Sequence, residues 1–246
     1  MTAVWATFVR EIRAYFLSPL AYVVLFFFLL VNGFVFAVVL SLLNDPTRPA
    51  GQPLDIFFTS VFLWIFLSFM TPVLTMRLLA EERSTGSIEV LMTAPVTEGQ
   101  VVLGKYLGAL VFYGFLWLPT GVYAVLVHVH SPIDWSTVAA GYLGIFAIGA
   151  LMLALGLFAS ALTDNPLIAA ILAFALNIPL IFGPLLLADL VTVPWLQDAL
   201  AYVNLYEHQV DFSQGIVDTR RWVYYLSTIV FFLFLSARTL EGNKWR

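Results

Sequence analysis

The chain has no cysteine among its 246 residues, and only 11% of its residues are charged. The absence of cysteine excludes disulfides, thiolate nucleophiles and cysteine-ligated metal sites. Soluble domains carry about 25% charged residues, so the scarcity of charge excludes an ordinary soluble domain. Hydrophobic residues make up 61% of the sequence, aromatic residues 16%, and the mean hydropathy is +0.95. This composition is typical of a chain embedded in lipid.

Charges are also missing from the centres of the long apolar runs. A helix needs roughly 20 apolar residues to cross a bilayer. The uncharged run from Ala14 to Asn44 meets this requirement and is too long for a signal-peptide core of about 7–15 residues. We predict six transmembrane helices at 19–43, 56–76, 101–127, 136–162, 167–190 and 222–238. The fifth contains two prolines and is expected to be kinked or broken.

Intramembrane charges usually mark ion or proton pathways. Apart from Lys105 and Asp189, each near an edge, the predicted spans carry no charge in their centres. This distribution argues against a proton-coupled carrier and against an intramembrane hydrolase that uses buried carboxylates. We expect Lys105 to extend its ammonium group to the interface, as long cationic side chains do at helix ends.

The first residues have the pattern of an amphipathic helix. Apolar residues recur at helical spacing over 3–17, while Thr7, Arg10, Glu11 and Arg13 occupy the other face. Such a helix is expected to lie in the membrane interface. The sequence therefore predicts an all-α integral membrane protein with a single transmembrane domain over residues 1–246.

The distribution of Lys and Arg predicts the orientation. Six spans place both termini on one side, and that side carries eight basic residues against three on the other. The eight are Arg10, Arg13, Arg77, Arg83, Lys105, Arg238, Lys244 and Arg246, and the three are Arg48, Arg220 and Arg221. The positive-inside rule then places both termini and the connection 77–100 in the cytoplasm.

The stretch GQVVLGKY, residues 99–106, resembles a phosphate-binding loop at first sight. That motif requires Ser or Thr after its lysine and a strand before it, whereas Tyr106 follows Lys105. Thr97 and Gln100 instead form a capping-box pattern, which predicts that a helix begins at about Glu98. The glycines Gly99, Gly104 and Gly108 are then expected to allow close helix packing.

The connection 77–100 carries the strongest functional signal. Its segment 81–95 combines an acidic start, a glycine break at Gly86 and a short helix with Ile88, Leu91 and Met92 on one face. A helix of about two turns is marginal alone, so it needs a surface on which to dock. The segment has three glutamates and one arginine, and the negative cytoplasmic leaflet favours basic segments. A protein partner is therefore favoured over the membrane.

The sequence LLAEERSTGSIEVLMTAPVTEGQVVLGKYLGAL resembles the corresponding region of type 2 ABC transporter permeases. The stretch from Ser18 to Tyr22 also resembles these proteins, and FSQGIVDTRRWVYYLS, residues 212–227, is similar to their gliding-motility-associated branch. The resemblance implies the membrane subunit of an ATP-driven exporter, with no catalytic residues and no cofactor of its own. ATP and Mg would be bound by a separate ABC ATPase subunit.

The resemblance also implies which residues contact the ATPase. Glu82, Gly86 and Glu89 match the family pattern best, and Ser87 stands where threonine is common. The implied coupling helix and its approach comprise Glu81, Glu82, Arg83, Gly86, Ser87, Ile88, Glu89, Leu91 and Met92. Family members work as two membrane halves, so a homodimer or a heterodimer with a sister permease is expected in the bacterial inner membrane. The segment 192–221 would be external and form a partly re-entrant helical pair.

Two residues of the fifth span are candidates for the translocation path. Asn177 and Pro179 lie in mid-membrane, where a buried amide must find a partner. Packing between helices is the simpler role for a single asparagine in a span, and the sequence leaves both roles open.

Two other functions remain open. His128 and His130, with Asp134 nearby, could serve a membrane-embedded enzyme of lipid metabolism, although residues two apart point to opposite sides of a helix and no further ligand is evident. The chain could also be a membrane anchor for an ATPase, without transport activity.

Overall fold

The computed structural model describes residues 3–43, 53–86, 97–188 and 190–242, and these residues contain helices but no strands. The helices are α1 (Ala3–Leu17), α2 (Pro19–Leu43), α3 (Pro53–Thr59), α4 (Val61–Thr75), α5 (Ala80–Ser84), α7 (Glu98–Trp117), α8 (Gly121–His130), α9 (Trp135–Leu162), α10 (Pro166–Leu187), α11 (Pro194–Val203), α12 (Leu205–Ser213) and α13 (Thr219–Gly242), with the 3-10 turn η1 (Leu118–Thr120) between α7 and α8. Six stretches are long and apolar enough to cross a membrane. The predicted all-α integral membrane fold is confirmed for the part of the chain that is described.

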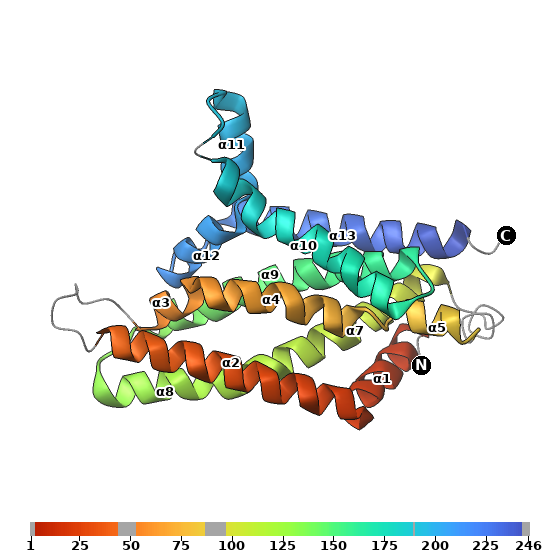
Figure 1. The fold of residues 1–246 in the computed structure, drawn as a ribbon, viewed down its shortest axis with the longest axis horizontal. Helices are drawn as coiled ribbons and strands as arrows, with labels where there is room; N and C mark the ends of the chain where they lie inside the picture. Colours follow the sequence, from red (N-terminus) through yellow and green to blue (C-terminus); the bar gives the residue numbers. More distant parts are fainter. Residues whose placement is uncertain (1–2, 44–52, 87–96, 189, 243–246) are drawn as a thin grey trace.

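Helix α9 forms the centre of the bundle and packs against α4, α7, α10, α12 and α13 (Figure 1). Its glycines allow this close packing. A Cβ atom built on Gly149 would lie 2.1 Å from Cζ of Tyr113 on α7, and one on Gly156 would lie 2.1 Å from Oγ1 of Thr75 on α4. Phe158 of α9 faces the opposite side, where it contacts Phe232 of α13 with ring centroids 5.7 Å apart.

Three of the predicted spans differ in detail from the helices observed. The second is divided at Ser60 into α3 and α4, and the third is divided by η1, which contains Pro119. In contrast, α10 continues from Pro166 to Leu187 through Pro179 and Pro184. The fifth helix is therefore not broken, since α10 accommodates both prolines within one helix, and the predicted kink stays a prediction.

Both ends of the described chain lie at the same end of the bundle, together with α5 and the start of α7 (Figure 1). The turn between α8 and α9 lies at the opposite end, as an even number of spans requires. Near that end, α12 packs on α9, with Leu205 and Phe212 fully buried. Helix α11 has no buried residue and projects away from the bundle.

Candidate functional site

Helix α1 packs closely against the first half of α7. A Cβ atom on Gly104 would lie 2.7 Å from Cβ of Thr7, and one on Gly108 would lie 2.7 Å from Cβ of Glu11. Gly99 has no such neighbour within 4 Å among the residues that the structure describes. The predicted role in close packing is therefore confirmed for Gly104 and Gly108, and the described residues give Gly99 no such role. The contact turns the polar face of α1, which carries Thr7 and Glu11, toward α7.

This packing creates an ion-pair cluster of Arg10, Glu11, Glu82 and Lys105, which we call the charged junction. Nζ of Lys105 lies 2.7 Å from Oε1 of Glu11 and 2.9 Å from Oε1 of Glu82. Arg10 donates to the same Glu82 oxygen at 2.5 Å and lies 3.5 Å from Glu11. The junction thus joins α1, α5 and α7 with two positive and two negative charges.

Lys105 does not extend its ammonium group into solvent, and its level relative to the membrane interface stays a prediction. Its side chain is only 2% exposed, because α1 covers it and supplies a carboxylate. A buried ammonium requires an opposite charge, and this requirement could have indicated a carboxylate partner. The sequence analysis missed Glu11 in that role because Glu11 and Lys105 are 94 residues apart.

The turn between α4 and α5 is fixed to its neighbours by hydrogen bonds. Oγ of Ser160 on α9 accepts from the backbone N–H groups of Leu79 and Ala80, both at 3.0 Å. The Tyr15 hydroxyl on α1 donates to the Leu74 carbonyl at 2.7 Å. Burial raises the pKa of Tyr15, and the nearby Glu11 raises it further, so the phenol stays neutral and remains a donor. Neither contact was predicted.

The predicted partner-contact residues fall into two groups. Glu81, Glu82, Arg83 and Gly86 are described, whereas Ser87, Ile88, Glu89, Leu91 and Met92 lie outside the described residues. Helix α5 ends at Ser84, and Gly86 follows with φ +70°. That backbone conformation favours glycine, so the predicted break at Gly86 is confirmed.

The described members of this set lie close together but have different partners. Glu82 belongs to the charged junction, and Nε of Arg77 lies 3.6 Å from Oε2 of Glu81 at the surface. Arg83 is half-buried, and its Nη2 atom has no hydrogen-bond partner among the residues the structure describes. Of these described residues, Glu82 therefore forms the ion pairs that join α5 to α1 and α7.

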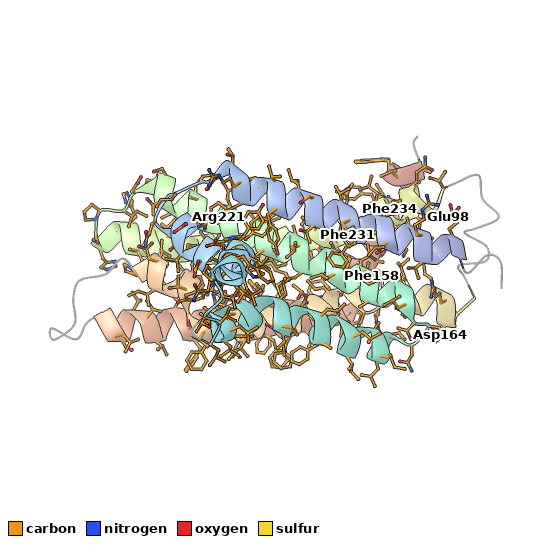
Figure 2. The ribbon with its side chains drawn as sticks, turned by 90° about the horizontal axis from the view of Figure 1, so that it is seen from above. Glu98, Phe158, Asp164, Arg221, Phe231 and Phe234 are labelled. Atoms are coloured by element: carbon orange, nitrogen blue, oxygen red, sulfur yellow. The ribbon has the colours of Figure 1, made fainter. Side chains whose placement is uncertain are left out.

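The capping box predicted at Thr97 is present. The Thr97 side chain accepts from the backbone N–H of Gln100, and the Gln100 side chain accepts from the N–H of Thr97. Helix α7 begins at Glu98, at the same end of the molecule as Asp164 and opposite to Arg221 (Figure 2). The whole GQVVLGKY stretch is helical, so it forms no phosphate-binding loop.

The two candidates for a translocation path occupy different environments. Asn177 is fully buried, and its Nδ2 donates to Oγ1 of Thr71 on α4 at 3.1 Å. Pro179 is exposed on the surface of α10. The contact shows that Asn177 joins α10 to α4, and the assignment of both residues to a path stays a prediction.

The histidine cluster does not have the geometry of a metal site. Both His128 and His130 lie in helix α8, where residues two apart face different directions. Asp134 is the N-cap of α9 and accepts from Ser136 and Thr137; these hydrogen bonds lower its pKa. No group of three potential ligands occurs in the described ranges. These contacts do not support a metal site formed by His128, His130 and Asp134.

Comparison with protein families returns one match. Residues 51–206 fit the model described as ABC-2 family transporter protein, which covers more than half of the chain. No curated protein sequence shows significant similarity to the chain. The matched range includes helices α9 and α10 and the connection between α5 and α7, and it ends inside α12.

Proposed function

The chain belongs to the ABC-2 transporter family and is a multi-pass membrane subunit of a transporter, and on this basis we propose that it forms half of an ATP-driven exporter. The ATPase would be a separate ABC subunit that binds ATP and Mg. The chain would lie in a bacterial inner membrane with both termini in the cytoplasm, because basic residues concentrate at the end that holds them. This end would then face the ATPase.

The observation that carries the proposal is the charged junction. It fixes α5 and α7, the helices on either side of the connection 87–96, to each other and to α1. A force on this connection would therefore move three helices together. Movement of rigid units against one another is an established form of conformational switching, and here it would link ATP binding to the membrane helices.

The remaining details extend the family assignment. We propose that two copies, or this chain and a sister permease, assemble into the complete membrane unit. The likeness to the gliding-motility-associated branch rests on residues 212–227, which follow the matched range. Asn177 and Pro179 remain proposed path residues.

The proposal is tested by purifying the chain with the ABC ATPase encoded beside it. The variant Ile88→Asp with Glu89→Arg should reduce recovery of the complex and lower its ATP turnover, because it reverses the polarity of the proposed contact. A matched control is Glu241→Arg, which changes an exposed carboxylate at the end of α13 and should leave both measurements unchanged.

Three results would contradict parts of this proposal. Absence of any complex with the ATPase would contradict the transporter assignment as a whole. An unchanged complex in the double variant would contradict the assigned contact. A stable complex that moves no substrate in an ATP-dependent manner would indicate a membrane anchor instead.

A further inference from the structure

A cavity of about 480 Å³ lies beside the charged junction, between α1, α2, the end of α4, α5 and α7. Its volume is within the roughly 300–1,000 Å³ range of small-ligand sites. The helix α5 and the start of α7, which contribute to its lining, lie at the end of the bundle that holds both termini. The cavity therefore lies at the level expected for lipid headgroups.

One side of the cavity is charged. Glu11 and Lys105 are buried there, Glu82 is partly buried, and together with Arg10 their charges sum to zero within the junction. Arg10 and Arg77 also line the cavity, with side chains 49% and 51% exposed. Arg77 has one ion pair among the described residues, to Glu81 at 3.6 Å. A guanidinium has five N–H donors, so Arg77 retains the capacity to bind an additional anion.

The other side of the cavity is apolar. It is formed by the first two turns of α2, with Leu20, Ala21 and Val24, and by Val73 and Leu74 at the end of α4. These residues belong to helices that cross the membrane. An apolar chain entering here would continue along membrane-facing surface, so the cavity suits a molecule with a polar head and an apolar tail.

The charges select among such molecules. The lining contains three cations, Arg10, Arg77 and Lys105, and three carboxylates, Glu11, Glu81 and Glu82, so its formal charge is zero. A cluster of basic residues alone would favour an anionic lipid. A balanced lining instead favours a headgroup that carries both charges, with phosphate near the arginines and an ammonium group near the half-exposed Glu81.

We propose that this cavity binds one zwitterionic phospholipid with a primary ammonium headgroup, such as phosphatidylethanolamine, from the cytoplasmic leaflet. Arg77 binds the phosphate with Arg10 beside it, Glu81 accepts from the ammonium group, and the start of an acyl chain lies against Leu20, Ala21 and Val24. The lipid fills the space between α1 and α4 next to the charged junction. This site does not depend on the presence of an ATPase.

The test is native mass spectrometry of the purified, delipidated full chain with dioleoyl-phosphatidylethanolamine, -phosphatidylcholine or -phosphatidylglycerol. We expect one retained phosphatidylethanolamine, bound about tenfold more tightly than phosphatidylcholine, whose methylated headgroup has no N–H to donate. The variant Arg77→Gln should weaken this binding about tenfold. Arg238→Gln, which removes an exposed cation on α13, should not.

A second pair of variants tests the location. Ala14 lines the cavity and is exposed on α1, so Ala14→Trp should fill the space and abolish retention. Ala6 is exposed on the same helix away from the cavity, and Ala6→Trp should retain the lipid. A melting temperature close to that of the unmodified protein would show that each variant is folded.

Equal retention of the three lipids, or undiminished retention in Ala14→Trp, would overturn the proposal. Inorganic phosphate could raise the melting temperature as much as the lipid does, and lose this effect in Arg77→Gln. That result would show that the site binds free phosphate and would contradict its assignment to a membrane lipid. Because these measurements use the chain alone, a negative result leaves the ATPase complex to be judged by its own assay.

Discussion

At the scale of single residues, Lys105 is the most sensitive position in the charged junction. The variant Lys105→Met should destabilise the protein by up to about 3–5 kcal/mol, because it leaves the neighbouring Glu11 and Glu82 with only the half-exposed Arg10 as a cation. Thermal unfolding in detergent measures the loss. Combining it with Glu11→Gln should restore part of the stability, since one of the two carboxylates that then share Arg10 is removed. A single variant as stable as the original protein would show that the junction has no structural role.

Asn177 permits a test that separates packing from transport. Asn177→Ala should cost about 0.6 kcal/mol and at most about 2 kcal/mol, the range for hydrogen bonds between membrane helices. Oδ1 of Asn177 is buried without a hydrogen-bond partner in the described part of the chain, which keeps the net contribution small. In a Thr71→Val background, Asn177→Ala should lower the free energy of unfolding by a smaller amount, because its hydrogen-bond acceptor is already absent. If transport falls by more than this loss of stability can explain, the result would support the proposed role of Asn177 in the translocation path.

His208 makes stability depend on pH. Burial, and to a smaller extent the nearby Arg221, lowers its pKa to about 4, so the folded protein keeps the ring neutral. The unfolded chain takes up a proton near pH 6.5. Stability from this group is therefore complete above pH 6.5 and declines as the pH falls toward 4. The melting temperature should drop less between pH 7.5 and pH 5 in His208→Gln than in the unmodified protein, and an identical drop would contradict this account.

At the scale of elements, the contact between α1 and α7 depends on two glycines. In Gly104→Ala the new methyl group would lie 2.7 Å from Cβ of Thr7 and 3.0 Å from the Val4 carbonyl oxygen. Overpacking of this kind typically costs about 1–3 kcal/mol. Gly99→Ala on the same helix meets no atom of the described residues within 4 Å and should raise stability slightly through its better helix propensity. Thermal unfolding of the two variants compares these effects, and equal melting temperatures would contradict the close contact.

Local signals in the sequence were sufficient to predict where several helices begin. The capping box at Thr97 depends on residues three apart, and α10 begins at Pro166, one residue before the predicted start of the fifth span. Gly86 marked the end of α5 because its backbone conformation has few alternatives. Such features involve neighbouring residues, so a single sequence contains the information.

Contacts between distant helices could not be predicted in the same way. Glu11 appeared to belong to a polar face in water, but α7 covers that face and pairs it with Lys105. Pro119 interrupts its helix, whereas Pro179 and Pro184 lie within a continuous one. The difference depends on how the surrounding backbone groups are satisfied, and this is decided by tertiary packing.

At the scale of the whole molecule, the fold places its polar features at opposite ends. The charged junction and the cavity lie at the end of the bundle that holds both termini, together with α5 and the start of α7. Arg221 and helix α12, which contains the buried His208, lie toward the other end. Between them, α9 forms an apolar centre packed by glycines. A signal that began at the charged end would reach the opposite end through the packed helices, since the described spans carry no chain of charges through their centres.

The absence of cysteine allows the orientation to be measured directly. A single cysteine placed at Ser84, the exposed last residue of α5, should react with a membrane-impermeant maleimide only after the cells are opened. One placed at Ser131, exposed between α8 and α9, should react in intact cells once the outer membrane is permeabilised. The unmodified chain provides the background, because it has no thiol. Labelling of Ser84→Cys but not Ser131→Cys in intact cells would reverse the proposed orientation, and the charged junction would then face away from any cytoplasmic ATPase.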